Sequence, residues 1–156
     1  LGPMTEGGTE SRRPSRPGAV LFMCGQNVIR SPMAEAIARQ ALPSGIWIAS
    51  AGVKKGERDP FVDVVLDEIG LTLGRRQPQT LEDMADDYFD LVITLTPEAH
   101  HAALELTRSS AVEVEYWPMP DPTVETGSRE LRLSAYRDVR DRLTRLIRER
   151  LVLAPE

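Results

Sequence analysis

Short apolar runs alternate along the chain with segments whose apolar residues recur every three or four positions. The runs at residues 20–23, 46–51, 91–95 and 112–116 have the length and composition of buried strands. Helical patterns cover residues 31–42, 59–70, 96–106 and 128–151, and a shorter helix is expected at 80–85. Strands that alternate with helices predict a parallel sheet with helices on both faces, and such a sheet binds ligands beyond the carboxyl ends of its strands.

Three of the predicted helices begin with a polar residue followed by proline. These pairs are Ser31-Pro32, Asp59-Pro60 and Thr96-Pro97. A side-chain oxygen at the N-cap accepts a hydrogen bond from a free backbone N–H, and proline suits the first helical position because its missing N–H is not needed there. We therefore expect Ser31, Asp59 and Thr96 to be N-caps.

Residues 1–18 differ in composition from the rest of the chain. They are rich in Gly, Ser, Pro and Arg and have no periodicity, so a disordered tail is expected. Leu1-Gly2-Pro3, before Met4, resembles what a protease leaves of an affinity tag. Residues 19–153 are predicted to form a single domain, with a monomer as the default state.

Composition limits the possible functions. The net charge of −5 and the pI near 5.2 argue against a nucleic-acid partner, which would need a basic face. No segment is apolar enough to suggest a membrane span or a signal peptide. The single cysteine cannot form an internal disulfide and fits a reducing compartment, so a cytoplasmic location is expected.

The most informative segment follows the first predicted strand. It begins at Cys24, ends at Arg30-Ser31 and leads into a helix, giving a Cys-x5-Arg-Ser loop. Backbone N–H groups of such a loop can curl around one anion, and a helix N-terminus adds partial positive charge. Arg30 can donate to two phosphate oxygens. The N–H dipoles of the loop and the guanidinium of Arg30 both favour the nucleophilic thiolate form of Cys24. The parts suit a covalent phosphatase, whereas a lone cysteine after an apolar strand is more often a small buried hydrophobe.

A covalent phosphatase also needs a general acid to protonate the leaving oxygen. The best candidate is Asp121, in the proline-rich segment 117–123 that follows the fourth predicted strand. That position brings it to the same edge of the sheet as Cys24. The alternative is an ordinary Asp-Pro turn, since Asp59-Pro60 shows the same dipeptide at a helix start.

Together these residues resemble the low-molecular-weight protein tyrosine phosphatases. The resemblance covers about residues 19–151. It rests on the order of the Cys24 loop, Ser31-Pro32-Met33-Ala34-Glu35, Ser50-Ala51-Gly52 and the late Asp121-Pro122. It implies a three-layer α/β sandwich around a four-stranded parallel sheet, wound as in flavodoxin. It also implies a phosphatase without a cofactor or a metal, acting on phosphotyrosine proteins or other phosphomonoesters and releasing inorganic phosphate.

The resemblance also implies residue roles. Cys24 would form a phosphocysteine, Arg30 would bind the phosphate with the amides of the loop, and Asp121 would serve as acid and then as base. Ser31 would hydrogen-bond the sulfur, while Asn27 would brace the loop with Ser50 as its partner. The remaining loop positions are Gly25, Gln26, Val28 and Ile29.

Departures from the family pattern concentrate around the substrate cleft. The Gly25-Gln26 order is reversed, Arg76 stands where the family has a bracing histidine, and the usual aromatic residues of the cleft are missing, unless Trp117 or Phe61 substitutes. The expected substrate rim is Lys54, Lys55, Arg58, Trp117 and Thr123, and its positive charge would suit an acidic peptide or another anionic phosphate ester.

Three other functions stay open. The first is phosphoarginine hydrolysis. Phosphoarginine phosphatases of the family have threonine at the position of Val28, and an aliphatic residue there resembles the tyrosine-specific members instead. Thioredoxin-coupled arsenate reductases share the loop, but they need further cysteines to resolve the intermediate. A phosphoprotein-binding module with little activity would keep the loop and Arg30 but lose the nucleophile or the acid.

Overall fold

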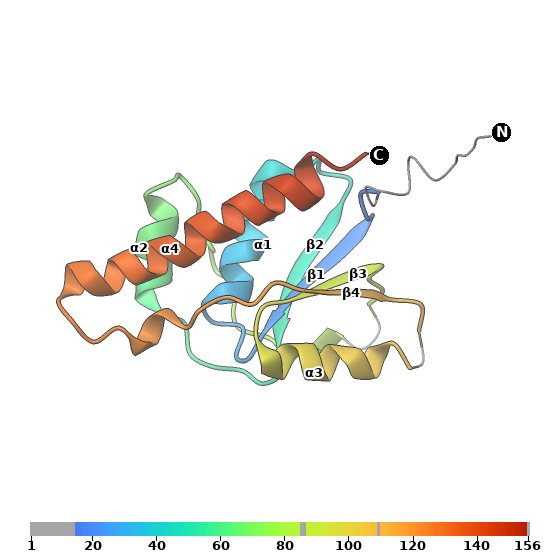
Figure 1. Cartoon of the computed structure of the whole chain (residues 1–156), viewed down its shortest axis with the longest axis horizontal. Coiled ribbons are helices and arrows are strands. Elements are labelled where there is room, and N and C mark those ends of the chain that lie inside the picture. Colours follow the sequence, from blue (N-terminus) through green and yellow to red (C-terminus); the bar gives the residue numbers. More distant parts are fainter. Residues whose placement is uncertain (1–14, 85–86, 109, 156) are drawn as a thin grey trace.

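A four-stranded parallel sheet forms the centre of the molecule (Figure 1). The computed structural model describes residues 15–84, 87–108 and 110–155. The strands are β1 (Ala19–Cys24), β2 (Trp47–Gly52), β3 (Leu91–Thr94) and β4 (Glu113–Tyr116), in the spatial order β2-β1-β3-β4. Cys24, the last residue of β1, pairs with Gly52, and Met23 pairs with both Ala51 and Thr94. The strand order reverses direction beside β1, which is where sheets of this kind bind ligands.

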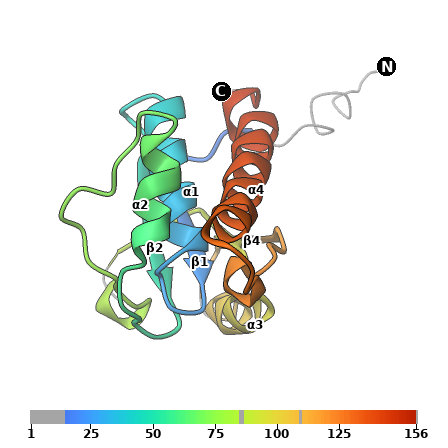
Figure 2. The ribbon, with the colours of Figure 1, turned by 90° about the vertical axis from the view of Figure 1, so that its left-hand side faces the viewer.

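Helices cover both faces of the sheet, which confirms the predicted three-layer α/β fold (Figures 1 and 2). α1 (Arg30–Ala41), α2 (Pro60–Asp67) and α4 (Arg129–Ile147) lie on one side. α3 (Pro97–Leu106) and the short 3-10 helix η2 (Glu82–Met84) pack against the other face. A second 3-10 helix, η3 (Pro122–Val124), precedes α4, which ends in a π-helical turn, η4 (Arg148–Val152).

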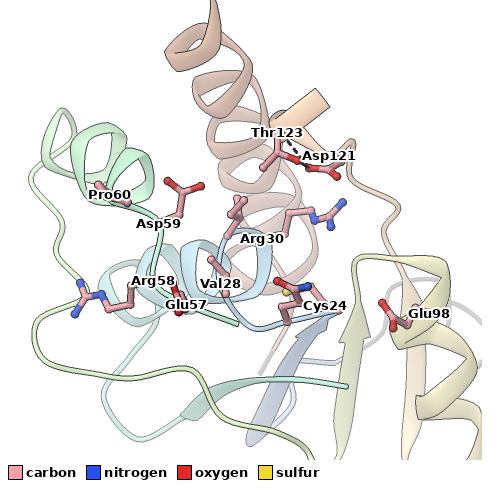
Figure 3. Close-up of a pocket in the computed structure, with 13 residues that line it drawn as sticks. Cys24, Val28, Arg30, Glu57, Arg58, Asp59, Pro60, Glu98, Asp121 and Thr123 are labelled. Atoms are coloured by element: carbon pink, nitrogen blue, oxygen red, sulfur yellow. Dashed lines mark hydrogen bonds between the residues drawn. The ribbon is translucent and has the colours of Figure 1, made fainter. Parts of the chain in front are cut away.

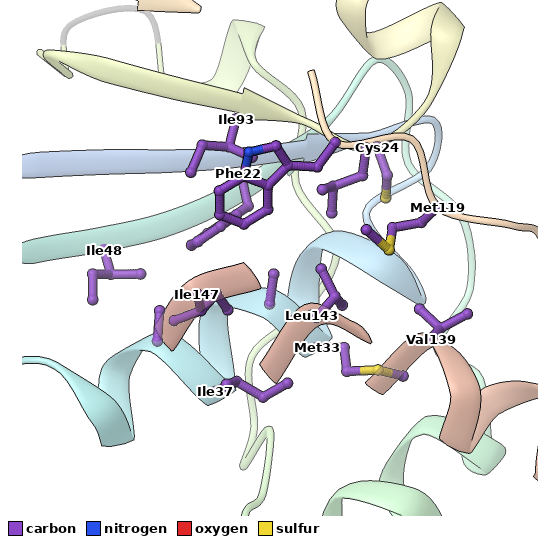
Figure 4. Packing of buried hydrophobic residues seen from close by; sticks show 14 of the residues in the cluster. Phe22, Cys24, Met33, Ile37, Ile48, Ile93, Met119, Val139, Leu143 and Ile147 are labelled. Carbon is purple, nitrogen blue, oxygen red and sulfur yellow. The ribbon is translucent and has the colours of Figure 1, made fainter. Parts of the chain in front are cut away.

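The main hydrophobic core lies between the sheet and the helices α1, α2 and α4 (Figure 4). Along β1, alternate residues serve opposite faces: Phe22 packs into this core, whereas Leu21 and Met23 pack into the smaller core under α3. This is the period of two expected of a strand that is buried on both sides. Fully buried side chains from four elements, β1, α1, β3 and α4, meet in the main core: Phe22, Met33, Ile93, Val139, Leu143 and Ile147.

Two of the three predicted N-caps are present. Asp59 accepts a hydrogen bond from the N–H of Phe61, and Thr96 accepts one from the N–H of Ala99. The prediction for Ser31 is wrong, because α1 begins at Arg30 and its N-cap position is Ile29, which makes no side-chain cap. Ser31 lies inside the first turn of α1, and its hydroxyl faces the end of β1 instead.

The other element boundaries shift by small amounts. The predicted strand at 46–51 is β2, one residue later, and the predicted helix at 80–85 is only the 3-10 turn η2, with residue 85 outside the described residues. The predicted helix at 128–151 is α-helical only to Ile147. Ile69, an apolar residue within the predicted helix at 59–70, is 44% exposed because α2 ends at Asp67.

The described part of the predicted tail, residues 15–18, packs onto the domain. Arg16 donates from Nε to the carbonyl of Leu151 at 3.0 Å and from Nη2 to the carbonyl of Val152 at 2.7 Å. Gly18 donates its N–H to Asp90. Residues 1–14 of that tail lie outside the described residues. Within the described ranges, no helix is long and apolar enough to cross a membrane.

Candidate active site

The loop after β1 has its carbonyl groups tied to the segment after β2. The carbonyls of Cys24, Gly25 and Gln26 accept hydrogen bonds from the N–H groups of Val53, Lys54 and Gly56 at 3.0–3.2 Å. These bonds hold the carbonyls toward residues 53–56 and away from the centre of the loop. An anion at the centre of the loop would therefore meet N–H groups rather than carbonyl oxygens, as in an anion nest.

Asn27 shapes the loop through both its backbone and its side chain. It is the one non-glycine residue with a positive φ, +58°, among those that the structure describes. Asparagine tolerates this left-handed conformation better than most residues. Its fully buried side chain donates to the hydroxyls of Ser31 and Ser50, at 2.8 and 3.0 Å, and accepts from Arg76 and from the N–H of Gln79, both at 2.9 Å.

The hydroxyl of Ser31 lies beside the candidate nucleophile. Ser31 Oγ is 3.0 Å from Cys24 Sγ and 3.5 Å from the carbonyl oxygen of Ala51. Because Asn27 already donates to this oxygen, the hydroxyl proton is free to point at the sulfur, which is the closer acceptor. The arrangement can stabilise a thiolate by one hydrogen bond.

An ionic pair lies beneath the loop. Arg76 donates to Ser50 at 2.8 Å and lies 3.3 Å from Glu35, while Ser50 donates to the same Glu35 oxygen. Burial lowers the pKa of Arg76 and Glu35 opposes that shift, yet a guanidinium stays charged at any ordinary pH. We call this network the floor of the site; it consists of Asn27, Ser31, Ser50, Arg76 and Glu35.

Above the floor lies an open pocket of about 490 Å³, shown in Figure 3. Cys24 and Arg30 face it, and Arg30 donates to the carbonyl of Met119 at 3.3 Å. The Nε of Arg30 is buried and has no hydrogen-bond partner among the described residues. Since a buried unpaired donor is costly, a ligand with acceptor oxygens would satisfy it. The loop residues that line the pocket are Gly25, Gln26, Val28 and Ile29.

Asp121 lies on the wall of this pocket, across from the loop (Figure 3). It caps η3 by accepting from the N–H of Thr123 at 2.9 Å, and the same oxygen accepts from the Thr123 hydroxyl at 2.7 Å. Partial burial would raise the pKa of Asp121. The two hydrogen bonds from Thr123 and the charge of Arg30 outweigh that effect, so the pKa lies below its usual value. The second carboxylate oxygen makes no hydrogen bond to another described residue.

The second Asp-Pro pair reaches the same pocket from α2. Asp59 lines it as well, but both of its oxygens are occupied: one accepts from the N–H of Phe61 and the other from the hydroxyl of Tyr136. Two Asp-Pro helix caps therefore face one pocket, and only Asp121 has an oxygen free to exchange a proton. Asp121 can therefore cap η3 with one oxygen and still exchange a proton with the other.

The expected basic rim is only partly present. Arg58 and Thr123 line the pocket, whereas Lys54, Lys55 and Trp117 do not. Lys55 pairs with Asp83 at 3.3 Å, because the segment that binds the loop carbonyls carries the lysines past the pocket. Trp117 is buried against Phe22. Arg58 directs its guanidinium to Asp63 and the carbonyl of Gly74.

Acidic residues take part in the pocket wall instead, and the sequence analysis missed them. Glu57 and Asp59 line one side and Glu98, from the first turn of α3, lines the other (Figure 3). An oxygen of Glu98 is 2.6 Å from the point where a Cβ on Gly25 would stand. Glycine at position 25 leaves this space to the carboxylate, whereas a larger residue would require the Glu98 side chain to move.

Gln26 explains the other half of the reversed Gly25-Gln26 order. A Cβ on Gly56 would lie 2.6 Å from the amide oxygen of Gln26 and 2.7 Å from Val28. The Gln26 side chain therefore packs against a glycine of the neighbouring segment. No group of three or more His, Cys, Asp or Glu side chains placed to hold a metal ion occurs in the described part of the chain.

A cysteine at the end of a central parallel strand, under an N–H loop that closes on an arginine, defines a class of phosphate-handling α/β proteins. The family model for low molecular weight phosphotyrosine protein phosphatase matches residues 19–152. The chain belongs to this family, as its sequence indicated.

Relatives in this family differ in their named activities. An arsenate reductase of Halalkalibacterium halodurans is 28% identical over 129 residues, which cover 83% of this chain and 91% of that protein. The crystal structure of a low molecular weight protein tyrosine phosphatase from T. tengcongensis is 26% identical, with a TM-score of 0.67 and coverage of 83% and 94%. The YwlE arginine phosphatase from Geobacillus stearothermophilus shares the fold, with a TM-score of 0.69, 24% identity and coverage of 84% and 88%.

Proposed function

We propose that this protein hydrolyses phosphotyrosine-type monoesters through a phosphocysteine at Cys24. The observation that carries the proposal is the placement of three groups around one pocket. The sulfur of Cys24 lies beside Ser31 at the bottom, while Arg30 and Asp121 lie on the wall. Family membership supports a phosphatase in general.

In the first step, the thiolate of Cys24 attacks phosphorus and the bond from phosphorus to the leaving oxygen breaks. The protonated carboxyl of Asp121 gives its proton to that oxygen, so the alcohol leaves neutral. Arg30 and the loop N–H groups stabilise the charge on the three non-bridging oxygens in the transition state. Ser31 stabilises the thiolate before attack.

In the second step, water attacks the phosphocysteine and the carboxylate of Asp121 accepts its proton. The phosphorus–sulfur bond breaks, inorganic phosphate leaves and the thiolate of Cys24 is restored. The lowered pKa of Asp121 suits this step, because the carboxylate is the form that can accept a proton. The first step needs the protonated carboxyl, which a lowered pKa disfavours, so the rate of that step should fall as pH rises.

Arsenate reduction is the second candidate, because several relatives carry that name. Two-electron reduction of arsenate in this fold oxidises thiols, and a chain that forms its own disulfide needs at least two cysteines. This chain has Cys24 alone. Arsenate reduction would therefore need an external thiol for every electron, whereas ester hydrolysis needs only water.

Phosphoarginine hydrolysis and non-catalytic phosphoprotein binding are weaker alternatives. Val28 lines the pocket with an aliphatic side chain, which is the residue type that resembles tyrosine-specific members. Both Cys24 and Asp121 are retained, which a pure binding module would not require. We therefore favour an enzyme that acts on a phosphoprotein, and we take a monomer as its default state.

Hydrolysis of p-nitrophenyl phosphate from mildly acidic to neutral pH tests the proposal. We expect turnover by the wild type, none by Cys24→Ser, and a loss of about 10²- to 10⁴-fold in kcat for Asp121→Asn. Asp59→Asn is the matched control, because it alters the other Asp-Pro cap of the same pocket and should keep most of the activity. Arsenate-dependent oxidation of added glutathione or thioredoxin, without hydrolysis of the ester, would favour the reductase instead.

A further inference from the structure

Glu98 is an unpaired carboxylate beside the candidate nucleophile. It lies in the first turn of α3, is exposed and makes no ion pair or side-chain hydrogen bond with another described residue. Its oxygen occupies the space that a side chain at position 25 would fill. In Figure 3, Glu98 extends toward Cys24 from the side of the pocket away from α2.

Neither Arg30 nor Arg58, the two cations that line the pocket, forms an ion pair with Glu98 in the described part of the chain. Arg58 is held by Asp63 and the carbonyl of Gly74, with its guanidinium directed away from Cys24 (Figure 3). Glu57, on the opposite side, is likewise exposed and without an ion pair among the described residues. Two carboxylates without an ion pair, those of Glu98 and Glu57, therefore flank the position of the substrate.

The pocket is an anion site on independent grounds. The buried Nε of Arg30 has no hydrogen-bond partner among the residues that the structure describes, and the loop carbonyls are tied away from the centre of the loop. A free carboxylate beside a phosphate dianion repels it, which is a cost that phosphate recognition alone does not explain. A substrate offsets that cost when it carries a positive group next to its phosphate.

Aromatic stacking contributes little to substrate binding here. No aromatic side chain lines the pocket among the described residues. Trp117 is buried against Phe22, and Phe61 lies edge-on to Tyr136 with the guanidinium groups of Arg129 and Arg132 over its ring. A phosphotyrosine ring would meet only small apolar groups such as Val28 and Pro60. Charge beside the phosphate therefore has a larger share in selecting the substrate.

We propose that Glu98, with Glu57, selects phosphotyrosine peptides that carry lysine or arginine next to the phosphorylated residue. This inference rests on the proposed phosphatase function and names its substrate class. It reverses the acidic-peptide preference that Lys54 and Lys55 suggested from the sequence. Glu98 is a specificity residue that contacts the flanking cation and takes no part in bond breaking.

Two phosphotyrosine peptides that differ only in their flanking residues, lysine or glutamate, test the proposal. Exposed charge pairs contribute roughly 2- to 5-fold each, so the wild type should prefer the lysine peptide by up to about 10-fold in kcat/KM at low salt. Glu98→Gln should reduce that preference several-fold, mainly by improving the glutamate peptide. Added salt should also reduce it, because the carboxylates are exposed. Glu105→Gln, two turns further along α3, is the matched control and should leave the preference unchanged.

Failure of the substrate preference is distinguishable from failure of the proposed function. Turnover of p-nitrophenyl phosphate without a preference between the peptides overturns the role of Glu98 and leaves the phosphatase intact. If the aryl phosphate is not hydrolysed, fluorescence anisotropy of the same peptides with the wild type and Glu98→Gln decides the question. Tighter binding of the lysine peptide, lost in Glu98→Gln, supports the charge selection, and equal binding overturns it.

Discussion

The floor and the walls of the pocket are built in different ways. In the floor, every polar group of Asn27 and Ser50 has a partner, and the charge of Arg76 is met by Glu35. Around the opening, Glu57 and Glu98 have none among the described residues. The floor fixes one loop conformation, as satisfied buried networks do, and the opening leaves charges available to a substrate. The difference separates how the nucleophile is positioned from how the substrate is chosen.

Asn27 offers the largest effect on the floor. Asn27→Gly keeps the left-handed backbone and removes the side-chain hydrogen bonds, so we expect kcat for p-nitrophenyl phosphate to fall roughly 100-fold, about 2–3 kcal/mol. Asn27→Ala should lose about 1–2 kcal/mol more of folding stability because alanine is strained at a φ of +58°. Denaturant unfolding and steady-state kinetics measure the two effects. Wild-type kcat in Asn27→Gly would show that the floor does not position the loop.

Arg76 carries the charge of the floor. Arg76→Ala leaves the nearly buried Glu35 with the hydroxyl of Ser50 and one ionic partner, Arg39 at 2.9 Å, so we expect a loss of about 2–4 kcal/mol in unfolding free energy. We expect kcat to fall roughly 10-fold, since the two hydrogen bonds from Arg76 to Asn27 and Ser50 are lost. Arg76→Lys should recover stability more than kcat, because an ammonium lacks the planar fork. The exposed neighbour Arg75→Ala is the control, and an equal loss there would contradict the prediction.

A substitution of Thr123 tests the role of Asp121 through the pH dependence of kcat/KM rather than through the size of kcat. The hydroxyl and N–H of Thr123 hold the pKa of Asp121 below its usual value. Thr123→Val removes the hydroxyl bond, so the pKa of Asp121 should rise. The basic limb of the kcat/KM profile, where the acid loses its proton, should then move to higher pH. Thr126→Val, on the same loop, should leave the limb in place, and an unmoved limb in Thr123→Val would argue against Asp121 as the acid.

Substitution of Glu68, which lies outside the pocket, should have the smallest effect on activity and should instead change how stability depends on pH. Arg137 and Arg140 lower the pKa of Glu68 from 4.5 to about 2. A lowered pKa stabilises the fold above the unfolded value, and that stabilisation is lost as pH falls from 4.5 toward 2. Glu68→Gln should flatten stability over this window in denaturant titrations and leave kcat unchanged. A stability curve that keeps its wild-type slope would contradict the pKa shift.

Patterns within one segment predicted much of the fold. Apolar periodicity located the strands and helices to within a few residues, and the caps at Asp59 and Thr96 follow from local chemistry. Ser31 shows the limit of such reasoning. Its Ser-Pro sequence indicated a cap, but its role depends on where β1 ends, so its hydroxyl reaches Cys24 instead.

The parts of the site that depend on distant segments were harder to predict. Lys54 and Lys55 belong to the segment that binds the loop, yet the hydrogen bonds to the loop carbonyls turn their side chains past the pocket. Glu98 reaches the pocket from α3, more than seventy positions after Cys24, and no local pattern links the two. Gly25 lies beside that carboxylate, but a glycine in a loop does not identify the residue that packs against it.

The most direct test of the central claim is to trap the phosphocysteine. Asp121→Asn should slow the second step, so rapid quenching with p-nitrophenyl phosphate followed by mass spectrometry should find one phosphoryl group on the peptide that contains Cys24. Since Cys24 is the only cysteine of the 156 residues, a phosphoryl group bound to a cysteine sulfur must be attached to Cys24. Ester hydrolysis that proceeds without this adduct, or that survives Cys24→Ser, would contradict the account.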